Sequence, residues 1–166
     1  DSSARAEAKK QYGIDLMLPH ELYSFEPQIF DVITMWHVLE HVHTLNERVE
    51  EIYSLLKSGG KAIIAVPNCS SFDAEVYGKD WAAYDVPRHL YHFTPETIKA
   101  LFTKHKLNFV HSYPMKFDSF YVSMLTEKNV HKKNRLIPAF LNGFKSNMKT
   151  KNDAEKYSSV IYVFVK

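Results

Sequence analysis

The sequence predicts an α/β domain with a mainly parallel, doubly wound sheet. Two short runs, Phe30–Trp36 and Lys61–Val66, are apolar and rich in β-branched residues, which is typical of strands buried on both faces of a parallel sheet. Between them, apolar residues from Val38 to Leu56 recur at spacings of three and four, which predicts an amphipathic helix ended by Ser58-Gly59-Gly60. This alternation of strands and helices favours a parallel α/β sheet.

Further elements are predicted on both sides of this strand–helix–strand unit. Thr94 is placed to cap a helix that runs to about His105, with Pro95 at its first position and Thr97 at its third. The other expected elements are a helix over 4–11, strands over 14–18, 108–113 and 158–165, and an aromatic-rich loop over 69–93. The whole chain, residues 1–166, is expected to form a single domain.

The composition indicates an ordinary globular protein. Of the 166 residues, 45% are hydrophobic and 24% charged, and the net charge is +2. Such a charge gives no strong attraction to nucleic acid or membrane, and no apolar run reaches the roughly 18 residues that span a bilayer. The single cysteine, Cys69, excludes an internal disulfide, and the first residues lack the pattern of a signal peptide. We therefore expect a cytoplasmic protein that binds no nucleic acid and does not insert stably into a membrane.

Residues 114–157 differ in character from the rest. They contain nine Lys or Arg residues against four Asp or Glu residues. Interleaved with these charges are Leu136, Ile137, Phe140, Leu141, Phe144 and Met148. We expect an insert or cap segment before the final strand. Its apolar residues could cover a substrate or touch anionic lipid, or they could pack on the sheet and leave a solvated basic face, which is the more common arrangement.

Three stretches resemble class I S-adenosylmethionine-dependent methyltransferases of the methyltransferase 11/23 type. They are FDVITMWHVLEHV (30–42), LLKSGGKAIIAVPN (55–68) and DVPRHLYHFT (85–94). The resemblance covers about residues 14–113, and the last strand fits the family's closing strand. It implies a Rossmann-like sheet whose last strand is antiparallel, and S-adenosylmethionine as cofactor.

The resemblance also implies where the cofactor lies. Its methionine end would lie near Trp36 and His37, and its adenine near the turn that contains His20 and Glu21. Asp1 could bind the ribose hydroxyls, or it could lie two residues past the ribose-binding acid. In an open parallel sheet, ligands bind outside the carboxyl ends of the strands, which agrees with Trp36 and His37.

The acceptor would face the loop between the second strand and the capped helix. The substrate-binding candidates are Asn68, Trp81 and Tyr91, although large aromatic side chains more often serve to bury a loop. The catalytic candidates are Arg88, His89 and His92, because histidine has an unperturbed pKa near operating pH and can act as general base toward a hydroxyl acceptor. Alternatively, this loop is a structural latch ahead of the helix capped by Thr94.

The glycine-rich turn of the family is missing. The sequence contains no G-x-G, and the family's first two strands and first helix would lie upstream of Ser3. We therefore expect an N-terminally truncated domain that binds S-adenosylmethionine weakly, is inactive alone, and could form a homodimer through its exposed sheet edge. If the reading frame begins near Asp1, a non-enzymatic binding or scaffold module is the better interpretation.

Metal binding is not expected, although two patterns allow it. His37-Val38-Leu39-Glu40-His41 matches the H-x-x-E-H pattern of zinc hydrolases, a remote alternative because the motif directly follows a strand. Some quinone-pathway methyltransferases hold a divalent cation near this element, which makes Glu40 and His41 weak metal candidates. A carboxylate at a helix start is, however, favoured without any metal.

These observations together predict S-adenosylmethionine-dependent methyl transfer to a small molecule or to a lipid- or saccharide-linked acceptor. Oxygen is favoured as the methylated atom because of His89 and His92.

Overall fold

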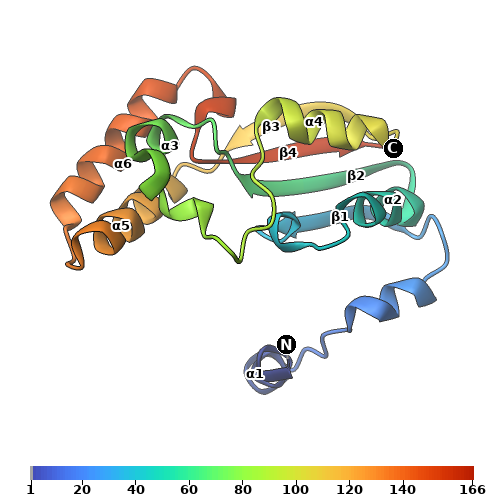
Figure 1. The fold of residues 1–166 in the computed structure, drawn as a ribbon. Helices are drawn as coiled ribbons and strands as arrows, with labels where there is room; N and C mark the ends of the chain where they lie inside the picture. The colour runs from blue at the N-terminus through green and yellow to red at the C-terminus, as the bar shows by residue number, and fades with distance from the viewer. Residues whose placement is uncertain (1) are drawn as a thin grey trace.

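A four-stranded mixed sheet forms the centre of the molecule in the computed structural model, which describes residues 2–166. Its strands are β1 (Phe30–Trp36), β2 (Leu56–Pro67), β3 (Asn108–Pro114) and β4 (Ser159–Val165), in the spatial order β1-β2-β4-β3. β1 and β2 are parallel, and β4 runs antiparallel to both β2 and β3 (Figure 1). The predicted α/β class and the antiparallel last strand are confirmed.

Six α-helices accompany the sheet within residues 2–166. They are α1 (Ser2–Tyr12), α2 (Leu45–Leu55), α3 (Phe72–Tyr77), α4 (Pro95–Lys104), α5 (Asp118–His131) and α6 (Leu136–Thr150). α3 and two single 3-10 turns lie in the stretch 69–93, which the sequence predicted as a loop. No helix of this part of the chain is long and apolar enough to cross a bilayer.

The main core lies between the sheet and the helices α2 and α4. Ile52 of α2 and Phe102 of α4 pack with alternate residues of β2 and β4, among them Ile64 and Phe164. The rings of Phe102 and Phe164 stack with centroids 4.2 Å apart. Both crossover helices therefore cover the same face of the sheet.

The N-terminus of α4 confirms its predicted cap. The Thr94 hydroxyl accepts a hydrogen bond from the Thr97 amide, with the two atoms 3.3 Å apart, and Pro95 is the first helical residue. These bonds satisfy backbone donors that the first turn would otherwise leave unpaired.

The predicted continuous helix over 38–56 is wrong. Leu39–His41 forms a single 3-10 turn, α2 begins only at Leu45, and Leu56 already belongs to β2. The reason lies in the backbone of Glu40, whose carbonyl accepts hydrogen bonds from the Leu90 and Tyr91 amides, with oxygen–nitrogen distances of 2.8 and 3.3 Å. A helix through this segment would need that carbonyl for its own ladder.

The predicted strand over 14–18 is also wrong. This segment is extended but pairs with no other strand among the described residues, and a strand is stable only when a neighbour satisfies its backbone groups. β1 is the edge of the sheet next to it and carries exposed apolar side chains such as Val32. Because an open edge can pair with another chain, the homodimer stays a prediction.

The carboxyl ends of β1 and β2 face α3, α5 and α6 (Figure 1). α5 and α6 pack against each other as a pair, with α3 beside them. Residues 118–150 thus form two helices at the end of the sheet rather than a helix laid on one of its faces. We call α5 and α6 the cap helices.

Candidate functional site

His37 follows directly after β1 and occupies a strained backbone conformation. Its φ angle of 51° lies in the left-handed region, which a residue with a side chain enters only when its surroundings hold it there. Its amide donates to the carbonyl of Ala65 in β2, at 3.0 Å. The end of β1 is thereby held against β2, and the imidazole is turned towards the cap helices.

Two carboxylates hold the His37 ring. Nε2 lies 3.0 Å from Asp118 Oδ2, at the start of α5, and Nδ1 lies 3.3 Å from Glu40 Oε1. The hydrogen bond to Asp118, and then that to Glu40, raise the pKa of His37 to about 9 against the opposing effect of burial. His37 is therefore an imidazolium at neutral pH and donates to both carboxylates.

Glu40 is the most deeply placed charge of this cluster. Only 1% of it is exposed, and its Oε2 has no hydrogen-bond partner within residues 2–166. Its Oε1 lies 4.0 Å from Nε2 of His89. A buried carboxylate oxygen without a partner is costly, and the hydrogen bond from His37 to Oε1 offsets part of that cost.

His89 points its free nitrogen towards the same space. Its Nδ1 donates a hydrogen bond to the Ala83 carbonyl at 2.8 Å, so Nδ1 carries the proton of the neutral ring and Nε2 carries a lone pair. Burial lowers the pKa of His89, which keeps the ring neutral. Nε2 of His89 can therefore accept a proton at neutral pH.

A cavity of about 300 Å³ joins these groups. It lies between the carboxyl ends of β1 and β2, the loop 82–89 and the inner side of α5. His37, Glu40, His89 and Asp118 supply its polar wall, and Tyr121, Val122 and Leu125 of α5 supply much of its apolar wall. We call this space the acceptor cavity.

The other two catalytic candidates lie outside the acceptor cavity. Arg88 is exposed and forms an ion pair with Asp85, with Nη2 and Oδ1 2.6 Å apart. His92 donates from Nε2 to the Tyr84 carbonyl at 2.9 Å and lines a separate hollow beside α4, together with Tyr91. The structure therefore separates His92 and Tyr91 from His89.

Asn68 and Trp81 are buried and engaged in structural hydrogen bonds. The Asn68 amide donates to the carbonyls of Glu155 and Tyr157, at 2.8 and 3.1 Å, and its oxygen accepts from Ser70. The Trp81 indole donates to Asp73 at 2.9 Å. Both side chains hold the loops around the acceptor cavity, and neither of them lines it.

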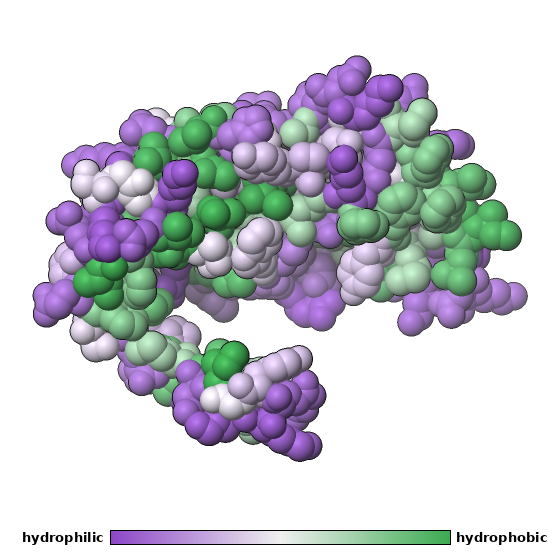
Figure 2. Space-filling model, turned by 180° about the vertical axis from the view of Figure 1, so that it is seen from behind, coloured by the Kyte–Doolittle hydropathy of each residue, from purple (hydrophilic) through white to green (hydrophobic). Residues whose placement is uncertain are grey.

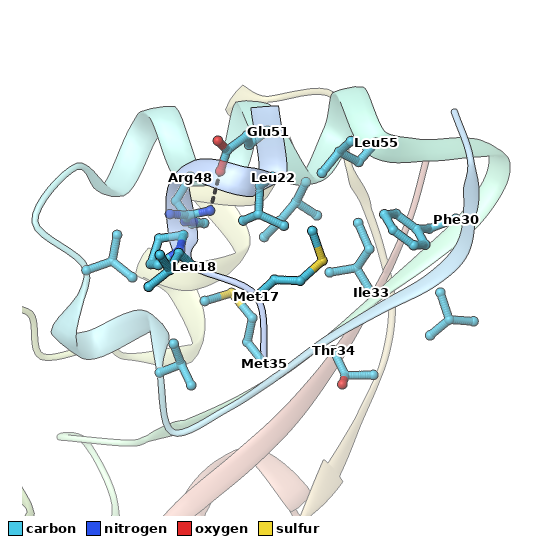
Figure 3. Close-up of a pocket in the computed structure, with 15 residues that line it drawn as sticks. Met17, Leu18, Leu22, Phe30, Ile33, Thr34, Met35, Arg48, Glu51 and Leu55 are labelled. Atoms are coloured by element: carbon cyan, nitrogen blue, oxygen red, sulfur yellow. Dashed lines mark hydrogen bonds and ion pairs between the residues drawn. The ribbon is translucent and has the colours of Figure 1, made fainter. Parts of the chain in front are cut away.

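A second, larger hollow of about 570 Å³ lies beside β1. Figure 3 shows that it is enclosed by Met17, Leu18 and Leu22 on one side and by β1 and α2 on the other. His20 and Glu21 belong to the same turn but do not line it. The Glu21 carboxylate instead accepts from the Leu18 amide and caps its own turn.

The remaining cofactor candidates lie at the end of β1 or at the N-terminus. Trp36 is the last residue of β1 and is about half exposed, at 49%. Asp1 lies outside the residues that the structure describes. The apolar walls of the hollow beside β1 suit an adenine ring, but residues 2–166 contain no glycine-rich turn to surround the rest of the cofactor.

The weak metal candidates lie beside the same cavity. Potential ligand atoms of Glu40, His41 and His89 all lie within 4.8 Å of one another. His41 Nδ1 donates to the Arg88 carbonyl at 2.9 Å, which leaves its Nε2 available. The helical pair of histidines that the H-x-x-E-H interpretation requires does not form, because His37 is left-handed and its Nε2 faces Asp118.

Sequence reasoning missed Asp118 and the cavity-lining Tyr121. Asp118 lies 81 residues from His37 and follows an irregular segment, so no spacing connects the two. Glu40 was considered only as a metal ligand or a helix-start carboxylate. Its position ahead of an apolar, periodic stretch gave no sign of burial.

An open sheet with a polar cavity at the carboxyl ends of two parallel strands defines a class of α/β ligand-binding domains. Within this class, the model of the methyltransferase domain family matches residues 2–112, more than half of the chain. The chain belongs to this methyltransferase family, whose methyl donor is S-adenosylmethionine. No curated protein matches it.

Solved structures are similar in fold. A methyltransferase of Thermotoga maritima, described as a possible histamine N-methyltransferase, aligns over 99% of this chain and 70% of its own, with 18% identity and a TM-score of 0.63. An S-adenosylmethionine-dependent methyltransferase of Archaeoglobus fulgidus aligns over 95% and 71%, with 17% identity and a TM-score of 0.56.

A third similar structure is phosphoethanolamine N-methyltransferase 2 of Haemonchus contortus, in complex with S-adenosyl-L-methionine. It is 18% identical with a TM-score of 0.52, over 86% of this chain. This chain spans only 34% of that enzyme's length. At such identities the likeness concerns the fold alone.

The raised pKa of His37 predicts a pH dependence of stability. The folded pKa of about 9 lies above the unfolded value of 6.5, so the stabilisation is complete below about pH 6.5 and is lost as pH rises through 9. The free energy of unfolding, measured by urea denaturation, should fall between pH 7 and 9.5. His37→Gln should remove most of this decrease and His89→Gln should preserve it; an equal decrease in all three proteins would contradict the assignment.

Proposed function

We propose that this chain forms the acceptor side of an S-adenosylmethionine-dependent methyltransferase that methylates a hydroxyl group. The acceptor is a small molecule or a lipid- or saccharide-linked precursor. One observation carries the proposal: Nε2 of His89, with its lone pair, lies 4.0 Å from the Glu40 carboxylate, and both residues line one cavity at the carboxyl ends of the strands. A hydroxyl group has one proton to donate, which Nε2 of His89 can accept while the nearby carboxylate favours the charged ring.

Methyl transfer depends mainly on alignment, because proximity and orientation supply most of the acceleration. In the proposed mechanism, His89 Nε2 takes the proton that the acceptor hydroxyl loses on methylation. Glu40, about 4 Å away, stabilises the imidazolium that results. His37 and Asp118 fix the position of Glu40 and of the start of α5, and Tyr121 offers an aromatic surface against which a sugar ring can pack.

Among residues 2–166, the proposed cofactor contacts are Trp36 and the walls of the hollow beside β1. The bound cofactor would supply a methyl group activated by its sulfonium. Pro19 and Leu22 offer apolar contact for an adenine ring, while His20, Glu21 and Asp1 stay proposed contacts of its polar parts. Because the described residues lack a glycine-rich turn, we expect residues 1–166 alone to bind S-adenosylmethionine weakly and to be inactive.

Cofactor binding should change the fluorescence of Trp36. This indole is about half exposed at the strand end, whereas Trp81, the other tryptophan of residues 1–166, is 2% exposed and hydrogen-bonded to Asp73. We predict that titrating S-adenosylhomocysteine into the longest natural gene product containing these residues shifts the emission. Trp36→Phe should abolish the shift while calorimetry still detects binding.

Absence of S-adenosylhomocysteine binding to that gene product would contradict the proposal. The non-enzymatic binding or scaffold interpretation would then be preferred. Binding with no change in Trp36 emission would contradict only the placement of the cofactor.

Substitution of His89 should lower turnover more than binding. With a hydroxylated acceptor identified by transfer of radiolabelled methyl groups, His89→Asn should lower kcat by about 10²- to 10⁴-fold, because a positioned base contributes that much. KM should change little, and the decrease of kcat/KM at acid pH should disappear. His92→Asn, which alters a histidine outside the acceptor cavity, is the matched control and should stay within a few fold of wild type.

Chelation tests the metal alternative directly. Activity that is unaffected by EDTA supports His89 as the proton acceptor. Activity that is abolished by EDTA and restored by a divalent cation would instead assign Glu40, His41 and His89 to that cation.

A further inference from the structure

Helix α6 turns its apolar side chains away from the protein. Six large apolar residues on it are between 49% and 76% exposed: Leu136, Ile137, Phe140, Leu141, Phe144 and Met148. We call this set the outer face of α6. The rings of Phe140 and Phe144 stack with centroids 6.4 Å apart, so the outer face is continuous. Figure 2 shows apolar side chains gathered at the end of the molecule that the cap helices form.

The opposite side of α6 makes its closest contacts with the rest of the protein. Its buried residues are small: Ala139, Gly143, Ser146 and Thr150. Gly143 packs so closely on α5 that an added Cβ would lie 2.9 Å from the Cα of Phe120, and Ser146 donates to Asp73 at 3.2 Å. α6 is therefore attached mainly through small residues and hydrogen bonds, with one ring contact, between Phe140 and Phe120, whose centroids are 5.3 Å apart. A continuous exposed apolar face of this kind marks an interaction site.

Basic side chains surround the outer face. Lys145 and Lys149 lie beside it on α6, and Lys132 and Lys133 lie in the turn between α5 and α6; all four are exposed. None of the four forms an ion pair within residues 2–166.

The acidic residues of α5 do not neutralise these lysines. Asp118 pairs with His37, and Glu127 pairs with Arg135 and lies close to His131. The outer face is thus apolar in its centre and positive at its border.

We propose that the outer face of α6 docks on the surface of an anionic lipid bilayer. Acyl chains match the apolar centre, and negatively charged headgroups match the lysine border. A second copy of the chain would bring like charges together. With 15 residues, α6 is about 22 Å long, shorter than the roughly 30 Å hydrocarbon layer, so it lies in the interface.

Docking in this way has a consequence for the acceptor cavity. Tyr121, Val122 and Leu125 of α5 line that cavity, and α5 packs directly on α6. When α6 lies on the membrane, the cap helices would separate the acceptor cavity from the lipid surface. The docking itself does not depend on the proposed methyl transfer.

Vesicle co-sedimentation tests the docking. The chain should bind vesicles of phosphatidylcholine with about 30% phosphatidylglycerol, should bind pure phosphatidylcholine much more weakly, and should be released by 0.5 M salt. Phe140→Ser combined with Phe144→Ser should lower the partition coefficient at least tenfold. Lys145→Gln combined with Lys149→Gln should lower it roughly fivefold for each lysine, on anionic vesicles only.

Matched controls separate docking from misfolding. Tyr12→Ser with Tyr23→Ser removes two aromatic rings elsewhere that are more exposed than Phe140 and Phe144, and Lys10→Gln with Lys104→Gln removes two other exposed lysines. Neither pair should change vesicle binding. Circular dichroism and the thermal midpoint should be unchanged in all four variants.

Equal partition on anionic and neutral vesicles, or no effect of the α6 variants, would overturn the proposal. It would also be overturned if no vesicle bound and sedimentation velocity showed a dimer that Phe140→Ser with Phe144→Ser converts to a monomer. In that case a second copy covers the outer face.

Discussion

The structure depends on one buried residue, Glu40, whose carboxylate and backbone carbonyl connect three separate parts of the chain. Its side chain accepts from His37 at the end of β1, its backbone carbonyl accepts from Leu90 and Tyr91 in the loop before α4, and His37 in turn reaches Asp118 at the start of α5. A carboxylate that is 1% exposed would be strongly unfavourable alone. The imidazolium of His37 offsets this cost, so the position of the cap helices and the charge of the cluster are coupled.

This coupling explains how an α/β sheet of modest size forms a polar cavity. The sheet aligns the carboxyl ends of β1 and β2, and the link from Glu40 through His37 to Asp118 holds the start of α5 over them, while the Ala82 amide donates to Thr126 further along the helix. His89 then completes the cavity, because its Nδ1 is engaged by the Ala83 carbonyl and its Nε2 is left free beside Glu40. The same cap helices present the outer face of α6 to the opposite side. One pair of helices thus separates the proposed chemistry from the proposed lipid surface.

Local signals predicted much of the fold and less of the site. The four strands of the sheet and the Thr94 cap follow from short-range patterns, which tertiary contacts did not override, whereas the antiparallel direction of the last strand was implied only by the resemblance to the family. The helix over 38–56 failed because the Glu40 carbonyl bonds to residues about 50 positions away, and the strand over 14–18 failed because no neighbour pairs with it. His37 and His89 were recognised as site residues, whereas the link from His37 to Asp118, across 81 residues, carries no sequence signal.

The coupling between Glu40 and His37 can be measured by a double-mutant cycle. The free energy of unfolding would be determined at pH 7 for wild type, Glu40→Gln, His37→Gln and the double variant. A coupling energy of about 1 kcal/mol or more, which disappears above pH 10 when His37 has lost its proton, is the expected result. Additive effects at pH 7 would contradict the central role of this pair.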